Sequence, residues 1–164
     1  MTRRLLLTVA GGDGSNLIDL TGVTTADFAA DLPITVNGGD GSDTILGSEF
    51  ADSLVGGNGG DSITGALADD TLEGGNGNDT LSGGVGDDSI LGGDGADSIS
   101  GDTGNDTVIA GNGADNVSGG DGTDSLNGSD GSDILNGDAG NDTLSGDNGT
   151  DSLLGGTDDD LIQG

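Results

Sequence analysis

The sequence predicts an all-β solenoid, in which short strands are laid one on another along a single coil. Three observations predict it: a nine-residue repeat that runs unbroken from residue 38 to residue 163, one aliphatic residue at a fixed place in every repeat, and glycine-rich segments between the aliphatic residues. One aliphatic residue in nine is too sparse for an amphipathic helix or a sandwich strand. It suits a repetitive coil that buries one side chain per short strand.

Composition alone leaves two classes open. The 164 residues include 38 Gly, 31 acidic residues and only two basic ones, Arg3 and Arg4, which gives a formal net charge of −29. Such a composition is typical of disordered acidic chains, and also of folds that depend on bound cations. A disordered segment keeps its composition but has no reason to keep its phase over fourteen repeats, so the periodicity favours the folded class.

Several function classes are excluded by what the chain lacks. It has no His, Cys, Lys, Tyr or Trp, so it offers no imidazole base, thiol nucleophile or disulfide. We therefore expect no enzyme and no small-molecule substrate. Two cations and two aromatic residues argue against binding to nucleic acid. No apolar run approaches the roughly 18 residues of a membrane helix, so no membrane span is expected.

The columns of the repeat are sharply defined. Counted from Gly38, the first position is Gly in thirteen repeats, the fourth is Gly in eleven, the sixth is Asp in all fourteen and the eighth is aliphatic in all fourteen. Glycine adopts the positive φ that other residues resist, so a stretch such as 74–79 is predicted to be a turn. The next three residues, 80–82, are predicted to form a short strand whose middle residue, Leu81, faces inward.

The unit Gly-Gly-x-Gly-x-Asp-x-aliphatic-x resembles the repeats-in-toxin (RTX) nonapeptide, which is known as a calcium-binding β-helix repeat. The resemblance covers residues 38–163. It implies a right-handed parallel β-roll with two nonapeptides per 18-residue turn and calcium between successive loops on both edges.

The repeat supplies what calcium needs. Calcium takes six to eight oxygen ligands from carboxylates and backbone carbonyls, and here a glycine-rich turn ends in an aspartate. Because alternate repeats fall on the same edge of a two-repeat turn, the candidate metal ligands form two ladders. The first ladder contains Asp43, Asp61, Asp79, Asp97, Asp115, Asp133 and Asp151. The second ladder contains Asp52, Asp70, Asp88, Asp106, Asp124, Asp142 and Asp160.

The spacing also sets the number of ions. Seven loops enclose six gaps, so two ladders hold at most twelve Ca²⁺, which would bring the net charge from −29 to −5. The three residues other than Gly at the fourth position, Phe50, Ala68 and Asp158, all fall on the second ladder. We therefore expect about 9–12 ions, a full first ladder, and a second ladder that is well formed only between about residues 83 and 160. Without calcium the chain is expected to be unfolded.

Residues 1–37 are predicted to form an N-terminal cap, and residues 38–164 the β-roll. The segment 7–16 parallels the segment 34–43, which makes it one partial calcium loop with Asn16 in the aspartate place. Residues 24–31 are predicted to form a short helix capped by Thr24 and ended before Pro33. Leu5–Leu7 and Leu32 are expected to cover the first coil, as solenoids require.

Two structural roles fit this sequence, and both are extracellular because millimolar calcium is found there. In one, the chain stacks head to tail into a calcium-stabilised filament: we identify only solenoid and cap, with Arg3 and Arg4 near one end and 158–160, three aspartates, near the other. In the alternative, which the resemblance implies, it is a folding and secretion module of a larger secreted enzyme, toxin or adhesin. We favour stacking.

Overall fold

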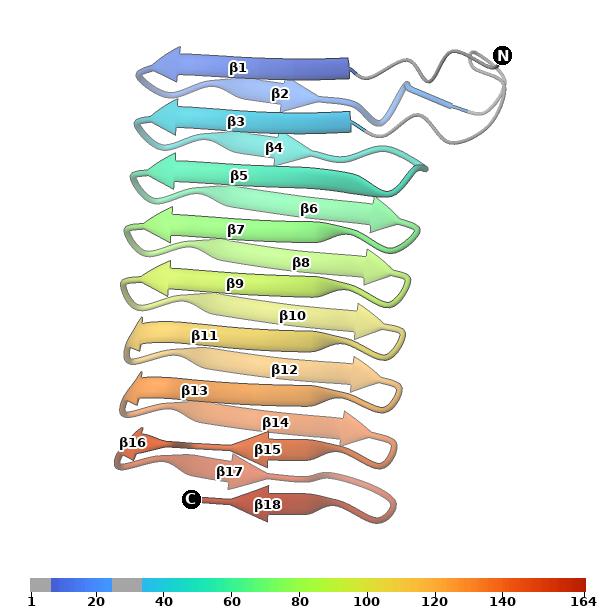
Figure 1. The fold of residues 1–164 in the computed structure, drawn as a ribbon, viewed down its shortest axis with the longest axis vertical. Coiled ribbons are helices and arrows are strands. Elements are labelled where there is room, and N and C mark those ends of the chain that lie inside the picture. Colours follow the sequence, from blue (N-terminus) through green and yellow to red (C-terminus); the bar gives the residue numbers. More distant parts are fainter. Residues whose placement is uncertain (1–6, 25–33) are drawn as a thin grey trace, which may run out of the picture.

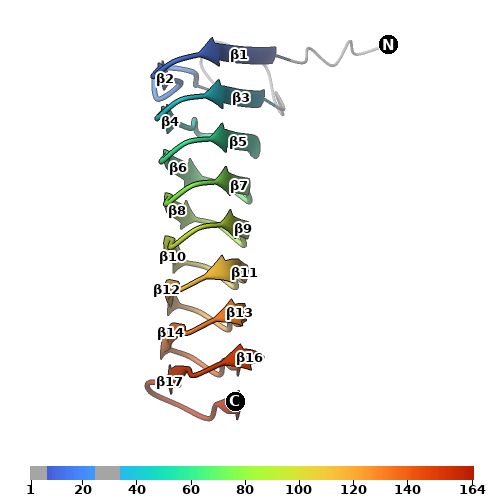
Figure 2. The same ribbon diagram turned by 90° about the vertical axis from the view of Figure 1, so that its left-hand side faces the viewer.

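The computed structural model describes residues 7–24 and 34–164, and it shows a single long coil (Figure 1). Up to β15, strands with odd numbers run one way in front and strands with even numbers return behind them, and the chain descends as it turns. This combination makes the coil right-handed. When the roll is viewed from one edge, its successive turns lie directly above one another (Figure 2). The described residues contain no helix that could span a membrane.

The strands form two parallel sheets that face each other across the core. The ten-stranded sheet contains β1 (Leu7–Asp13), β3 (Ile34–Asp40), β5 (Asp52–Asn58), β7 (Thr71–Asn76), β9 (Ser89–Asp94), β11 (Thr107–Gly113), β13 (Ser125–Gly131), β15 (Thr143–Ser145), β16 (Asn148–Gly149) and β18 (Leu161–Gln163). The eight-stranded sheet contains β2 (Leu17–Asp19), β4 (Thr44–Leu46), β6 (Ser62–Leu67), β8 (Thr80–Val85), β10 (Ser98–Thr103), β12 (Asn116–Asp121), β14 (Ile134–Ala139) and β17 (Ser152–Leu154). The all-β parallel roll expected from the sequence is confirmed.

The register repeats every 18 residues, so that like positions of the nonapeptide lie side by side. Leu54 pairs with Leu72, for example, and Leu72 pairs with Ile90. The first turn is the exception, because Leu7 pairs with Ile34, 27 residues later. This offset is the one that the likeness between segments 7–16 and 34–43 predicts, and it places an extra nonapeptide length in the first turn.

The core is a single file of eighth-position side chains from both sheets. From Ile45 to Leu144 each of these side chains is at most 3% exposed, as the sequence predicts. Ile34 and Val36 extend the file toward the N-terminus. At the other end Leu153 is only partly buried and Ile162 is 47% exposed, because no further turn of the described chain covers them.

The strands are longer than the three residues predicted. β8, for example, runs from Thr80 through the first three positions of the next repeat, where Gly84 pairs with both Ala66 and Asp102. A neighbour 18 residues away on either side offers these backbone groups hydrogen-bond partners, so part of the predicted turn joins the sheet. In such repeats the true turn is confined to the fourth to sixth positions.

Part of the predicted cap lies outside the described residues. This applies to the helix expected at 24–31 beyond Thr24, to Leu5, Leu6 and Leu32, and to Arg3 and Arg4. Within the described part, Leu7 and Val9 pack against the core, and β1 and β2 are the first members of the two sheets. The division at residue 37 stays a prediction.

Candidate metal centre

The sixth-position aspartates lie in two straight ladders, one on each edge of the roll. The first edge consists of the loops that lead from the ten-stranded to the eight-stranded sheet and end at the first-ladder aspartates. The second edge consists of the loops that lead back and end at the second-ladder aspartates. Twelve of the fourteen side chains are 1–4% exposed, and only Asp151 and Asp160, in the last loop of each edge, are partly exposed.

The ladder carboxylates, with the exception of Asp52, reach back to the turn before them. The backbone N–H of Asp43 donates to Oδ1 of Asp61 at 2.7 Å, and the N–H of Asp52 donates to Oδ1 of Asp70 at 2.7 Å. The same bond recurs through both ladders at 2.7–3.1 Å, up to Asp151 on the first edge and Asp160 on the second. The repeat therefore places these carboxylates between two successive loops.

The second carboxylate oxygen has no such partner. One buried oxygen without a hydrogen bond is found on each of twelve aspartates: Oδ1 of Asp52 and Oδ2 of Asp43, Asp61, Asp70, Asp79, Asp88, Asp97, Asp106, Asp115, Asp124, Asp133 and Asp142. An ionised oxygen buried in this way is costly unless a cation or a donor neutralises it. Neither basic residue of the chain lies within the described part.

Backbone carbonyls line the same gaps. A Cβ placed on Gly57 or Gly59 would overlap the carbonyl oxygen of Gly39 or Gly41, so these carbonyls point at the following loop. A Cβ on Gly38 would overlap both Oδ2 of Asp43 and the carbonyl oxygen of Gly56. The first glycine is therefore required by close approach, whereas Gly57 and Gly59 also have positive φ, 115° and 136°.

This donor set fits calcium. No group of three or more acidic, His or Cys side chains gathers anywhere in the described residues, so the oxygens available in a gap are a carboxylate and several carbonyls. Calcium accepts such a mixture in flexible geometry, whereas magnesium prefers a stricter octahedron that retains water. The aspartates of the two ladders, together with the first, second and fourth carbonyls of the loops, are the residues that would hold the ion.

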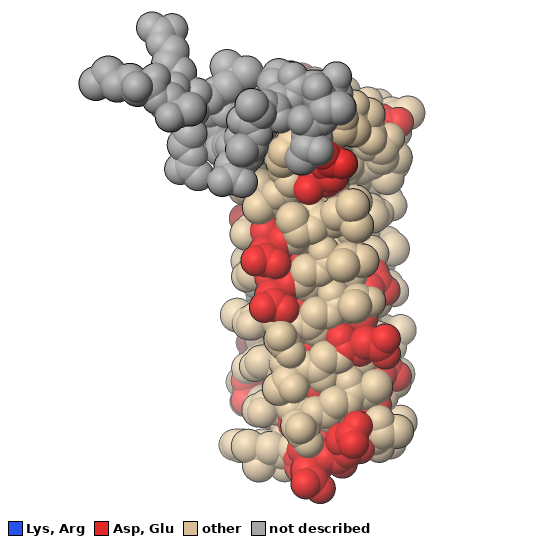
Figure 3. Space-filling view, turned by 90° about the vertical axis from the view of Figure 1, so that its right-hand side faces the viewer, with Lys and Arg blue, Asp and Glu red and all other residues tan. Residues whose placement is uncertain are grey.

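The electrostatics of the ladders show the cost of leaving them uncompensated. Burial raises the pKa of Asp70 to about 7, and it raises the pKa of Asp88, Asp97, Asp106 and Asp124 to about 6. The hydrogen bond from the preceding aspartate lowers each pKa, and neighbouring carboxylates raise it again. Four of these five residues lie on the second edge, which carries acidic side chains along its length (Figure 3).

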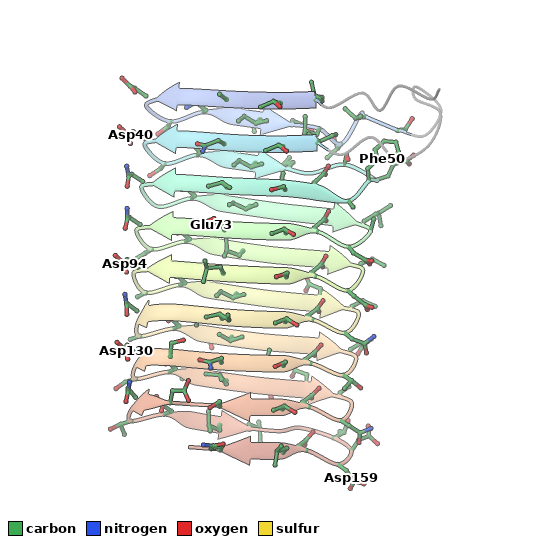
Figure 4. All side chains as sticks on the ribbon, in the orientation of Figure 1. Asp40, Phe50, Glu73, Asp94, Asp130 and Asp159 are labelled. Atoms are coloured by element: carbon green, nitrogen blue, oxygen red, sulfur yellow. The ribbon has the colours of Figure 1, made fainter. Side chains whose placement is uncertain are left out.

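The second edge is also the irregular one. In the loop 47–52, Asp52 Oδ2 accepts hydrogen bonds from the N–H of Ser48 at 2.8 Å and from its hydroxyl at 3.0 Å. The Ser48 hydroxyl in turn accepts from the N–H of Phe50 at 3.1 Å. Phe50, the fourth residue of this loop (Figure 4), is buried, and it is not among the residues with positive φ. As the sequence predicts, this loop departs from the repeat.

Ala68 behaves differently from Phe50. It adopts a φ of 74°, and its loop keeps the bond from the N–H of Asp52 to Asp70. Asp158 likewise takes a positive φ, 78°. The backbone of the second edge thus follows the repeat from about residue 65 rather than 83, and the expected ion content of these loops stays a prediction.

Sequence reasoning missed the second position. Its residue has positive φ in repeat after repeat, even where it is Ala66, Asp102, Ser129 or Asp138. Asp102 shows how the strain is offset: its carboxylate accepts hydrogen bonds from the hydroxyls of Ser82 at 2.5 Å and Ser100 at 2.7 Å. The sequence did indicate this, because the second position of the repeat is Gly in most repeats, but the Ala, Asp and Ser residues found there in the others obscured the pattern.

Comparison with protein families matches five stretches of the chain, residues 37–72, 64–99, 73–108, 91–126 and 127–162, to the RTX calcium-binding nonapeptide repeat. The chain belongs to this family. The matched stretches span both ladders and the whole regular part of the roll, so the resemblance that the sequence suggested is confirmed. Chains built from RTX repeats bind calcium. This agrees with the carboxylate and carbonyl oxygens that line the gaps between successive loops. A search of curated proteins found no relative.

Proposed function

We propose that this RTX β-roll is an extracellular structural protein whose fold is completed by about 9–12 calcium ions. One observation carries the proposal: the uncompensated buried oxygen on twelve ladder aspartates. A chain that buries so many carboxylates against one another cannot keep them ionised at neutral pH without cations. Calcium binding and folding are then one event. The role is structural, with no catalytic step and no nucleic-acid or small-molecule partner.

Removal of calcium tests this role. In excess EDTA at neutral pH the circular dichroism spectrum should be that of an unfolded chain, and millimolar calcium should restore the β spectrum in a cooperative transition. Magnesium at the same concentration should restore far less, because it gives up its water reluctantly. A β spectrum that persists after complete metal removal would contradict the proposal.

A matched pair of variants in one loop separates the metal site from general charge effects. Asp124 is 2% exposed and holds an unpartnered oxygen, whereas Asp121, three residues earlier, is exposed. Asp124→Asn should raise the calcium concentration at the folding midpoint by at least about tenfold, the scale on which metal sites respond to lost support. Asp121→Asn, with the same change in charge, should leave the midpoint within about twofold. Equal shifts would contradict a site-specific role for Asp124.

The extracellular setting follows from the kind of site. Sites built largely from carbonyls with one carboxylate per loop carry little ligand charge, and weak calcium sites of this kind are filled at the millimolar concentrations found outside cells. A folding midpoint between about 0.1 and 1 mM calcium would agree with that setting. A midpoint below about 1 µM would favour a site built for intracellular calcium instead.

The proposal includes head-to-tail stacking of copies. β18 pairs only with β15 and β17 only with β14, so each sheet offers an open strand at this end of the described chain. Leu161 is 66% exposed and Ile162 is 47% exposed there. An open strand can accept another strand. A second copy whose β1 docks on β18 would cover these side chains, and repetition of the contact would produce filaments.

The alternative is that the chain works as a module of a larger secreted protein. The same open strands are what a further turn of one polypeptide would cover, so this observation favours both roles. Electron microscopy and light scattering in millimolar calcium separate them. Stacking predicts filaments that Ile162→Lys shortens or abolishes, whereas Thr143→Lys, on an exposed side chain of β15, leaves them intact. Monomers at high concentration would favour the module.

A further inference from the structure

The loop 11–16 has the backbone of a calcium loop but a different side chain at its end. Gly12 and Gly14 have positive φ, 101° and 85°. Gly12 and Asp13 stand in register with Gly39 and Asp40 of the next first-edge loop. The loop therefore continues the first edge by one more step, and the sixth position of this step is Asn16.

The side chain of Asn16 makes contacts that no aspartate can make. Its amide nitrogen donates to Oδ1 of Asp43 at 3.0 Å and also to the carbonyl oxygen of Gly14. Its backbone N–H donates to the same Oδ1 at 2.7 Å. Both oxygens around the side-chain atom are acceptors, so this atom must be the NH₂ group of the amide.

Asn16 lies at the gap between the loops 11–16 and 38–43. The next gap, between the loops 38–43 and 56–61, lacks such a donor. Asp43 occupies the place of Asn16 there, and an ionised carboxylate has no hydrogen to offer to the carbonyl of Gly41, which points toward the following loop. The carboxylate that reaches back toward the loop 38–43 is that of Asp61, and its Oδ2 is buried without a partner. A gap bounded by carbonyls and a carboxylate requires a cation, whereas the gap before it already contains a neutral donor.

We infer that Asn16 ends the first calcium ladder: its amide joins the loops 11–16 and 38–43 without a metal ion. The inference rests on the proposed calcium-dependent fold and specifies where that dependence stops. One side chain then determines whether the first edge holds six ions or seven. The first turn of the roll is then linked to the second by hydrogen bonds in place of a bound ion.

Substitution at this position tests the inference. Asn16→Asp completes the sequence Gly-Gly-Asp-Gly-Ser-Asp on a backbone that already has the required form. Native mass spectrometry in saturating calcium should find one more ion on this variant than on the wild type. Asn37→Asp is the matched control, since Asn37 is exposed on β3 outside the turns and the change in charge is the same. It should bind the wild-type number.

A second variant keeps the result interpretable if Asn16→Asp weakens the first turn. Asn16→Ala should bind the wild-type number of ions but speed amide hydrogen exchange in β1 of the calcium-loaded protein by several-fold, because two side-chain hydrogen bonds are lost. Anomalous scattering should show a peak between the loops 11–16 and 38–43 in Asn16→Asp alone.

The possible failures are distinct. An ion in that gap of the wild type, or an unchanged ion count in Asn16→Asp while the wild type binds its full set, would overturn the inference and leave the proposed function standing. If neither chain binds calcium, both are wrong.

Discussion

The two edges of the roll carry the same aspartate ladder on different loops. On the first edge the fourth position of the loops is always Gly, and third-position Asn and Asp side chains join successive turns: Asn58 donates to Asp40 at 2.7 Å, and Asn112 donates to Asp94 at 2.6 Å. Asp40, Asp94 and Asp130 mark this edge in Figure 4. The second edge has apolar third positions at Leu67 and Val85.

The difference shows how much of a repeat is required by metal geometry and how much by packing. Aspartate is held on both edges, and the first glycine is held in every loop except the one that begins at Ala110 on the first edge, because the carboxylate and the adjacent carbonyl leave little space for a side chain. The fourth glycine is replaced at Phe50, Ala68 and Asp158, all on the second edge. The second edge therefore has more strain and more charge to neutralise, and the predictions below address this contrast.

The largest effect is expected from pH in the absence of calcium. The folded-state pKa of Asp70 is about 7 and those of Asp88, Asp106 and Asp124 about 6, above the ordinary value of 3.8. A raised carboxylate pKa means that the folded state binds protons more tightly than the unfolded state. It therefore destabilises the folded state above about pH 7, and this cost is relieved as pH falls toward 4.

Acidification should thus act as a partial substitute for calcium. In EDTA the β signal should increase between pH 8 and pH 5, and Asp70→Asn on the second edge should reduce this pH dependence more than Asp61→Asn on the first. Circular dichroism against pH measures both. A metal-free chain that loses β structure on acidification over this range would show the sign to be wrong.

The next effect concerns the fourth glycine of the first edge. Gly95 has a φ of 143°, and a Cβ there would overlap the carbonyl oxygen of Gly77. Gly95→Ala should therefore lower the free energy of unfolding in calcium by at least about 2 kcal/mol, given the cost of this conformation for an L-residue. Gly22→Ala is the control, because nothing lies within 4 Å of its Cβ position. Its effect should stay within about 0.5 kcal/mol, and equal losses would contradict the steric argument.

The sequence predicts the fold and the two ladders because both depend on position within a strict repeat. An invariant Asp and an invariant aliphatic residue, nine residues from their equivalents, can occupy only one place each in an 18-residue turn. The likeness of 7–16 to 34–43 likewise predicts the register of β1 on β3. Contacts between neighbouring turns were not predictable in the same way.

Those contacts depend on local pairs that no column reveals. Ser48 closes the loop of Asp52, and Ser82 with Ser100 supports Asp102 at a positive φ. To predict such a pair, one must know the side-chain rotamers of residues that meet within a turn or between neighbouring turns. The exposure of Ile162 was missed for another reason: an aliphatic column indicates a core, but burial also needs a neighbouring turn.

A smaller effect is expected at Ala68, where the second edge tolerates a residue with a Cβ. Its φ of 74° lies in the left-handed region. Ala68→Gly should raise the free energy of unfolding in calcium by about 0.5–1 kcal/mol. The cost of holding an L-residue at positive φ disappears, and this gain exceeds the loss that comes from the greater entropy of glycine in the unfolded chain. Ala96 is the fifth residue of the first-edge loop 92–97 and has no positive φ. Ala96→Gly should therefore lower the free energy of unfolding. Denaturant unfolding in saturating calcium measures both, and a gain in both would indicate that φ is not the cause.

The smallest effect concerns the third-position side chains, which are Asn or Asp in every regular loop of the first edge and join several of its successive turns. Asn112 is exposed, and its bond to Asp94 exchanges for bonds to water in the unfolded chain, so Asn112→Ala should cost about 0.5–1 kcal/mol. Thr103, at the equivalent place on the second edge, is also exposed, and Thr103→Ala should cost less. Chemical denaturation with calcium held in excess would resolve the difference. If Thr103→Ala proves the more costly, the hydrogen-bonded third positions do not stabilise the first edge, and its regularity must come from its glycines alone.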